Sequence, residues 1–283
     1  SMLATRLPGI LPPLTSAEAL EIAAIRSASG QPATHSRRAP FLSCHASTSP
    51  AGLLGGGQPP RPGNISLAHH GVLMMDELTE FRRTVIESLR EPLETGRITL
   101  SRGPYSETFP ARFLLVATMN PCPCGNLGDP ARACRCTPAQ IRRYQARLSG
   151  PLLERFDLGI EMMREPAGGV PDKAPTPEDS ATVARRVQSA RQRQLTRQAC
   201  TNGHLPVGRF DDCLALQSDA RTLLAQAADR FGWSWRSQHR VLRVARTVAD
   251  LADSATVTPA HLAEAMALRR PLDHLVSAEA NPA

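Results

Sequence analysis

Two short apolar segments, each followed by polar residues, constrain the fold and chemistry of this chain most. Residues 72–75 lead directly into Asp76 and Glu77, and residues 114–119 lead into Asn120. A nucleoside triphosphatase needs a carboxylate at a strand end to hold Mg²⁺ through water and a second carboxylate to orient the attacking water. It also needs a polar side chain beside them that senses the γ-phosphate. The pattern favours such a site, although buried strands that merely reach solvent also end in acids.

The phosphate-binding half of such a site is missing from the sequence. Lys173 is the only lysine, and it lies in a Pro-rich stretch. No G-x-x-x-x-G-K-[ST] loop can be written anywhere along the chain.

Three further segments support the nucleotide interpretation. They are residues 148–157, read as a helix end that leads into a short strand with Arg155 at the junction, residues 233–240, which open a long Arg-rich helix, and residues 1–13. Together with the two apolar segments they resemble the AAA+ ATPases of the magnesium-chelatase group, and most closely the ComM (YifB-like) family. The resemblance runs from residue 1 to about residue 270 and is most specific over 61–161.

The resemblance implies a role for each matching residue. Asp76 would position Mg²⁺, Glu77 would polarise the attacking water, and Asn120 would sense the γ-phosphate. Arg155 would act in trans on the nucleotide of a neighbouring subunit. Arg236 matches the second sensor of the family, which reaches from the helical lid to the γ-phosphate. The implied cofactors are ATP and Mg²⁺.

The first residues match the segment that follows the Gly-rich loop and its lysine in that family. We therefore expect the chain to begin just past this lysine. Ser1 is then either the Mg²⁺-ligating serine of the loop or a residue that precedes a start at Met2. Without the N–H groups and lysine of the loop, we expect the chain alone to bind ATP poorly and to hydrolyse it at a background rate.

A β-hairpin is predicted just before the strand that leads to Asn120. Residues 97–100 and 105–109 alternate in polarity around the turn Arg102-Gly103-Pro104. A hairpin in this place marks the AAA+ clade that includes several DNA motors, so Arg102 at its tip is a candidate pore or DNA contact. A solvated turn is the other interpretation.

Four cysteines form two close pairs in a short Gly-containing stretch. They are Cys122, Cys124, Cys134 and Cys136. Four thiolates from two such pairs can enclose a tetrahedral Zn²⁺ with a structural role. The usual zinc pairs have a C-x₂-C spacing, so reduced thiols or a redox pair remain alternatives.

The predicted fold class is α/β, a parallel-sheet AAA+ domain that lacks its P-loop segment and is followed by a small helical lid. The expected divisions are a core at 1–165 with a Cys-rich insert at 120–137, a linker at 166–178, and the lid at 179–283. Lid helices are expected at 179–199, 211–231, 235–252 and 259–269, the last with Thr258 as its N-cap and Pro259 as its first residue. In the core we expect helices at 1–13, 16–29 and 81–94, with a loop or edge hairpin at 30–62.

The resemblance implies an ATP-driven hexameric helicase that promotes DNA branch migration during uptake of transforming DNA. Its partners would be single-stranded or branched DNA and further copies of itself in a ring. The net charge of +7 is almost wholly arginine, which suits phosphate contacts but also follows from GC-rich coding. We expect most lid arginines to form a solvated face.

Two other functions stay open. The ATPase subunit of magnesium chelatase is the enzymatic alternative, and that subunit lacks the four-cysteine block. A non-hydrolysing assembly or binding module is favoured by the missing loop. The sequence has no apolar run of membrane-spanning length and no secretory signal pattern, so we expect no membrane partner and a cytoplasmic location.

Overall fold

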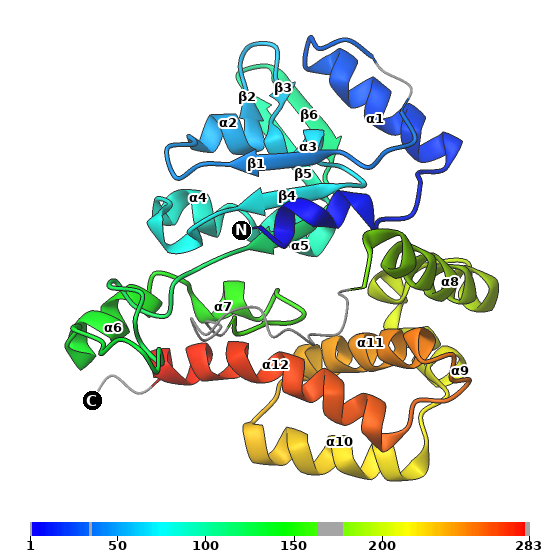
Figure 1. The fold of residues 1–283 in the computed structure, drawn as a ribbon. Coiled ribbons are helices and arrows are strands. Elements are labelled where there is room, and N and C mark those ends of the chain that lie inside the picture. The colour runs from blue at the N-terminus through cyan, green and yellow to red at the C-terminus, as the bar shows by residue number, and fades with distance from the viewer. Residues whose placement is uncertain (1, 34–35, 163–177, 281–283) are drawn as a thin grey trace. The chain divides into compact units, whose positions relative to one another are not determined.

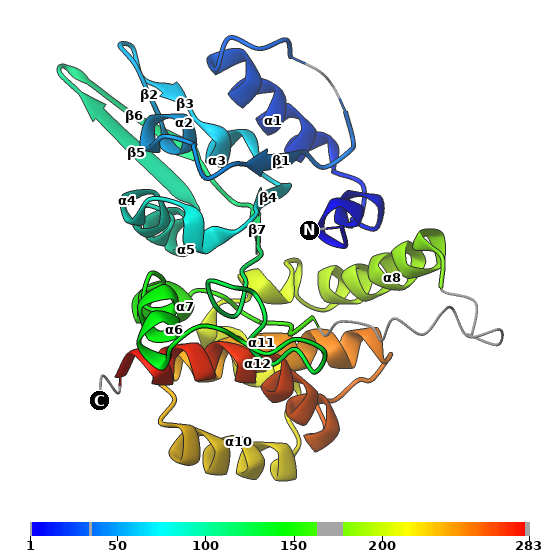
Figure 2. The same cartoon turned by 60° about the vertical axis from the view of Figure 1, so that its left-hand side comes forward.

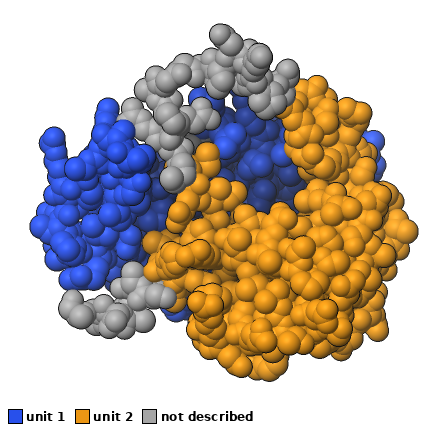
Figure 3. Space-filling model, turned by 60° about the horizontal axis from the view of Figure 1, so that its bottom comes forward, with its two compact units in different colours: residues 1–155, 281–283 blue, residues 156–280 orange. Residues whose placement is uncertain are grey.

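The computed structural model describes residues 2–33, 36–162 and 178–280. The chain divides into two compact units, one that ends at Arg155 and one that spans Phe156–Ala280 (Figure 3). The expected linker, 166–178, lies outside the described residues except for its last position.

A parallel three-stranded sheet forms the centre of the first unit, as predicted. Its strands are β1 (Phe41–Cys44) and β4 (Val72–Met75), labelled in Figure 1, and β7 (Leu114–Ala117), labelled in Figure 2. They pair in the order β1-β4-β7. All four residues of β4 are buried, because a central parallel strand is covered on both faces. The register brings Cys44, Met75 and Ala117 into one row at the carboxyl ends of the strands.

The edge strand β1 corrects the expectation for residues 30–62. That stretch contains a parallel strand and the helix α2 (Pro50–Leu54), besides the small antiparallel pair β2 (Gly55–Gly56) and β3 (Arg61–Pro62). Pairing with β4 stabilises β1 as a strand, and this non-local pairing is not visible in the local composition, which is rich in loop-forming residues.

The helices of the first unit differ from the expected ones at their ends. The first is a 3₁₀ helix, η1 (Ala4–Gly9), which contains Pro8 and stops before Pro12. The second, α1 (Ser16–Ala28), is capped by Thr15, whose side chain and that of Glu18 form a capping box.

The expected helix at 81–94 is two shorter helices that follow the turn η2 (Leu78–Glu80). These are α4 (Arg83–Glu87) and α5 (Arg90–Thr95). Pro92 has no N–H to donate to the carbonyl of Ser88, so the hydrogen-bond ladder is interrupted at this point. Helix α3 (Asn64–Leu67) precedes β4.

The predicted hairpin is confirmed as β5 (Arg97–Arg102) and β6 (Tyr105–Pro110), with Arg102 paired to Tyr105 at the tip. Figure 2 shows it extending away from the sheet beside β2 and β3. The side chain of Leu100, on β5, lies against β2. A Cβ added to Gly55, on β2, would lie only 2.9 Å from the Cδ1 atom of Leu100. Gly55 also has a φ of +110°, so both space and backbone conformation require glycine there.

The second unit consists mainly of helices. They are α8 (Ser180–Gln198), η3 (Asn202–His204), η4 (Val207–Arg209), α9 (Phe210–Leu214), α10 (Ser218–Phe231), α11 (Trp235–Leu251) and α12 (Pro259–Ala280). The expected helix at 211–231 is divided because Ala215 adopts a φ of +48°, which a helix cannot contain. Thr258 precedes α12 and accepts a hydrogen bond from the N–H of His261 at 3.5 Å, as its predicted capping role requires.

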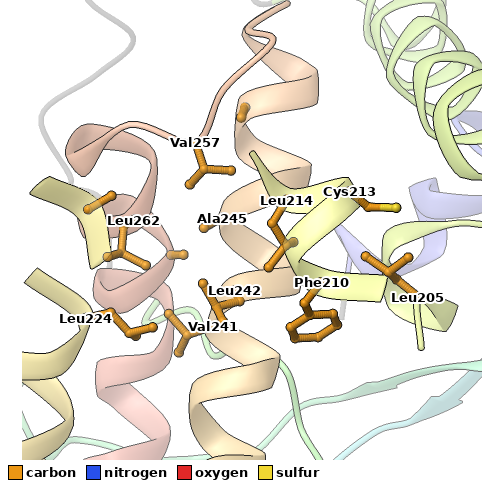
Figure 4. Packing of buried hydrophobic residues seen from close by; sticks show 13 residues of the cluster. Leu205, Phe210, Cys213, Leu214, Leu224, Val241, Leu242, Ala245, Val257 and Leu262 are labelled. Atoms are coloured by element: carbon orange, nitrogen blue, oxygen red, sulfur yellow. The ribbon is translucent and has the colours of Figure 1, made fainter. Parts of the chain in front are cut away.

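Apolar side chains from α9, α10, α11 and α12 meet in the core of this unit (Figure 4). No strand follows Arg155 within the described residues 156–162, contrary to the prediction. The N–H of Gly159 donates instead to the carbonyl of Leu268 in α12 at 2.8 Å.

Two arginines of this unit are buried and are exceptions to the solvated face expected for most of them. Arg246 and Arg269 are each 1% exposed. Arg246 donates through Nη2 to Asp250 Oδ1 at 2.9 Å, and Asp250 is also 1% exposed. Arg197 and Asn202 donate to the same carboxylate at 2.7 and 2.8 Å. Arg269 pairs with Asp273 at 3.2 Å, so both buried arginines have a carboxylate partner, as burial demands.

None of the described helices combines the length and the apolar character needed to cross a bilayer.

Candidate functional site

Asp76 and Glu77 lie at the carboxyl end of β4, where Thr118 follows the adjacent strand β7. The hydroxyl of Thr118 donates to Asp76 Oδ1 at 2.5 Å and accepts from the N–H of Glu77 at 3.0 Å. Its own N–H donates to the carbonyl of Met75 at 3.1 Å. One threonine therefore fixes both predicted catalytic acids to the neighbouring strand.

The backbone at Glu77 is in the left-handed region, with a φ of +53°. A residue other than glycine pays about 1–3 kcal/mol for such a conformation, and it persists only where the surroundings hold it. The carbonyl of Thr118 accepts from the N–H of Leu78 at 2.8 Å, so Thr118 holds the chain on both sides of the turn. The result is that the Glu77 side chain is exposed to solvent.

Asn120 lies three residues beyond the last paired row of β7, at the same edge of the sheet as Asp76. Its side chain is exposed, and its Oδ1 lies 3.9 Å from the position of a Cβ on Gly125. The loop that carries the four cysteines of residues 122–136, here called the cysteine loop, therefore folds back towards Asn120.

Residue patterns alone did not identify Thr118. Its position directly after a strand was the one available signal, because the hydrogen bond that gives it a role crosses between strands.

The four predicted metal-binding cysteines come together in the structure. Their sulfur atoms all lie within 4.8 Å of one another. The Cys122 sulfur is 3.5 Å from that of Cys124 and 3.7 Å from that of Cys134, and the last two are 3.6 Å apart. A tetrahedral zinc with Zn–S bonds of about 2.3 Å separates its sulfurs by about 3.8 Å. The donor set and its spacing thus fit Zn²⁺, and none of the four is in a disulfide.

The thiols of this cluster differ in acidity. Backbone hydrogen bonds, that of Arg135 above all, lower the pKa of Cys124 to about 6. Desolvation, together with hydrogen bonds to Cys124 and Cys122, raises the pKa of Cys136 to about 12. Four crowded thiols cannot all ionise without a compensating cation, and a metal ion supplies one.

The cysteine loop is anchored at both ends close to the edge of the sheet that carries Asp76 and Glu77, which we call the acidic edge. Gln145, on α6 (Pro138–Gln145), donates to the carbonyl of Pro121 at 3.2 Å. Tyr144 on the same helix accepts a hydrogen bond from Thr79 at 2.5 Å, and this contact is buried. Since Thr79 follows Glu77 by two residues, a metal in the loop would stabilise the surroundings of the acids.

Arg155 follows the short helix α7 (Gly150–Leu153) and is held by its own subunit. Its Nε donates to the carbonyl of Arg90 at 3.1 Å and its Nη1 to that of Pro151 at 2.5 Å. Its Nη2 forms an ion pair with Glu94. None of these partners belongs to the acidic edge.

The other predicted site residues lie elsewhere. Arg102 is exposed at the hairpin tip. Arg236 is an exposed residue in the first turn of α11, in the second unit, and Ser1 lies outside the described residues.

Glu21, His69 and His70 form a second cluster of groups that could ligate a metal. Both imidazole Nε2 atoms contact Glu21 Oε2, at 2.9 and 2.8 Å. His69 Nδ1 accepts the N–H of Arg112 at 2.9 Å, so the ring proton is on Nε2 and is donated to Glu21. A metal at that nitrogen would require an imidazolate, and we interpret the cluster as a structural clamp between α1 and the segment before β4.

Sequence comparison places these features among known proteins. Residues 1–169 match the family described as magnesium chelatase, subunit ChlI, and residues 177–269 match the family of its C-terminal region. These matches confirm the resemblance to the magnesium-chelatase group.

Individual relatives match nearly the whole chain. The uncharacterized protein YifB of Salmonella typhimurium is 45% identical over 271 residues, which is 95% of this chain and 53% of the relative. The competence protein ComM of Haemophilus influenzae is 43% identical over 272 residues, again 95% and 53%. The uncharacterized protein Mb2921c of Mycobacterium bovis is 40% identical over 282 residues, 95% and 54%. The chain spans about half the length of these relatives.

Proposed function

Because the chain belongs to the magnesium chelatase subunit ChlI family, we propose that the full-length protein is an AAA+ ATPase that hydrolyses Mg²⁺-ATP at the acidic edge. Asp76 holds Mg²⁺ through water, Glu77 polarises the attacking water, and Asn120 contacts the γ-phosphate. The observation that carries this proposal is the Thr118 hydroxyl, which bonds Asp76 and the Glu77 N–H together.

The remaining nucleotide contacts would come from parts of the protein that are not at this edge. Arg155 acts on the nucleotide of the next subunit in a hexameric ring, and Arg236 reaches the γ-phosphate from the helical unit. Ser1, if it belongs to the phosphate-binding loop, ligates Mg²⁺.

The work driven by hydrolysis is the movement of single-stranded or branched DNA, including branch migration during natural transformation. Support comes from the 43% identity to a protein named for competence and from the exposed Arg102 at the end of a projecting hairpin. A cation at such a tip can grip DNA phosphates as the ring turns over ATP.

The cysteine loop binds one structural Zn²⁺ in this proposal. The short separations of the four sulfurs support it, and four thiolates leave no open position for a substrate.

A paired ATPase assay tests the DNA function. In the full-length protein, Arg102→Ala should leave ATP hydrolysis without DNA nearly unchanged and reduce both the stimulation by single-stranded DNA and branch migration. Glu107→Ala, on the other hairpin strand, is the matched control and should retain stimulation. Equal stimulation of Arg102→Ala and wild type would reject the DNA contact.

A magnesium chelatase ATPase subunit is the second candidate, because both family matches carry that name. ATPase stimulation by a porphyrin-loading partner, with none by DNA, would favour it over the DNA motor.

A further inference from the structure

The guanidinium of Arg155 is largely buried before any neighbouring subunit is present. Its side chain is 12% exposed. The carbonyls of Arg90 and Pro151 accept from Nε and Nη1, and the carboxylate of Glu94 accepts from Nη2. Helix α5, which carries Arg90 and Glu94, thus supplies two of the three acceptors.

This arrangement leaves the guanidinium able to bind an anion. An arginine side chain has five N–H donors in a fixed plane, and the three contacts use one each. One N–H on Nη1 and one on Nη2 remain, and a phosphate accepts such neighbouring N–H groups well.

We propose that Glu94 is a positioning residue for Arg155, which it holds in the orientation that presents the remaining N–H groups to the nucleotide of the neighbouring subunit. The inference rests on the proposed trans role of Arg155. Glu94 would touch neither ATP nor Mg²⁺ and would act through the guanidinium.

The physical reason is the conformational freedom of arginine. A free arginine side chain loses rotamer entropy when it is fixed, and a pre-positioned one has lost it before the nucleotide arrives. Glu94 is the only side chain among the three acceptors. Without it Nη2 loses its acceptor on α5, and two backbone carbonyls alone hold the guanidinium.

The neighbouring glutamates provide internal comparisons. Glu87, Glu91 and Glu94 line the same shallow hollow beside Arg155. Glu87 pairs with Arg90 at 3.2 Å, and Glu94 pairs with Arg155. Glu91→Ala removes a carboxylate from the hollow but keeps the ion pair between Glu94 and Arg155. It therefore controls for a general loss of negative charge.

Steady-state ATPase kinetics of the full-length protein test the inference. Glu94→Ala should lower kcat by about tenfold or more, as misplacement of a catalytic group does, with little change in KM for ATP. Glu94→Gln should recover most of the rate because its amide oxygen accepts the same hydrogen bond. Glu91→Ala should behave as wild type, and unchanged thermal melting of each variant shows that the fold is intact.

Mixed rings show whether Glu94 acts through Arg155. Glu77→Gln subunits cannot activate water but still supply Arg155, so mixing them with Arg155→Ala or with Glu94→Ala subunits should restore hydrolysis. Rings that mix Arg155→Ala with the double variant Glu77→Gln, Glu94→Ala should stay slow, because the only Arg155 available lacks its partner.

The outcomes separate the two proposals. If Arg155→Ala hydrolyses ATP like wild type, the trans role of Arg155 fails and the positioning inference fails with it. If Arg155→Ala is inactive while Glu94→Ala keeps the wild-type kcat, only the positioning of Arg155 by Glu94 is overturned.

Discussion

Thr118 donates its hydroxyl hydrogen to Asp76 Oδ1 at 2.5 Å across the boundary between β7 and β4. The contact fixes the carboxylate rotamer at the edge where we place Mg²⁺. The hydroxyl oxygen of Thr118 also accepts the N–H of Glu77, so a single hydroxyl orients the Asp76 carboxylate and stabilises the strained turn that presents Glu77.

Replacement of Thr118 should therefore impair catalysis without removing either acid. We expect Thr118→Ala to lower the ATPase rate of the full-length protein by about 10- to 100-fold, the usual effect of losing a group that orients a ligand. Thr118→Ser should keep most of the rate because it retains the hydroxyl. The check is a Mg²⁺ titration of the rate, in which Thr118→Ala should need more metal; an unchanged titration would contradict the role of Thr118.

The cysteine loop should contain zinc. Elemental analysis of protein purified without chelators should give about one zinc per chain. Replacement of Cys122 by Ser should release the metal and make the loop sensitive to protease, because three remaining thiolates bind zinc less tightly. Cys213→Ser, in the helical unit, is the control and should retain the metal. Protein without bound zinc would reject the assignment.

Asp250 should control the stability of the helical unit. Desolvation alone would raise its pKa, but hydrogen bonds from Arg197 and Asn202 and the charge of Arg246 outweigh it and lower the pKa. Removal of one partner from a buried ion pair costs about 3–5 kcal/mol, so Asp250→Ala should unfold this unit at much lower denaturant. Fluorescence of Trp233 and Trp235, the two tryptophans of the chain, reports this unit selectively.

The lowered pKa of Asp250 determines how the stability of the helical unit changes with pH. Because the pKa of Asp250 is lower in the folded state, its contribution is fully present above the unfolded value of about 3.9 and is lost as the pH falls through the folded pKa. Wild type should lose stability in acid more steeply than Asp250→Asn. Parallel curves for the two proteins would argue against the network.

His69 should make the first unit less stable in mild acid. Burial is the main cause that lowers the pKa of this imidazole, and the hydrogen bond to Glu21 offsets it in part. Below about pH 6.5, His69 therefore binds a proton more readily in the unfolded chain than in the folded chain. The free energy of unfolding should fall as the pH is lowered through this region, and less so in His69→Gln. Urea titrations followed by circular dichroism measure both slopes, and equal slopes would exclude His69 as the cause.

Local sequence patterns predicted the parts of the fold that depend on local chemistry. The buried run of β4, the turn at Gly103 and the cap that Thr258 provides for α12 all act within a few residues of chain. Strand β1 was missed because its four residues become a strand through pairing with β4.

In the candidate site, too, residues that act through contacts between strands could not be predicted from local sequence. Asp76 and Glu77 stand out as consecutive acids after an apolar run, whereas Thr118 matters only through a contact made across the sheet. Arg246 departs from the solvated face expected for most lid arginines, and the available counter-signal was Asp250 four residues later on the same helix.

The measurement that tests the central claim most directly is steady-state ATP hydrolysis by the full-length protein and its Glu77→Gln variant, with ATP binding measured in parallel. Loss of the group that activates water should lower kcat by about 100-fold or more, while the affinity for Mg²⁺-ATP stays close to that of wild type because Asp76 is intact. A Glu77→Gln variant that hydrolyses ATP at the wild-type rate would contradict the assignment of the acidic edge as the catalytic site.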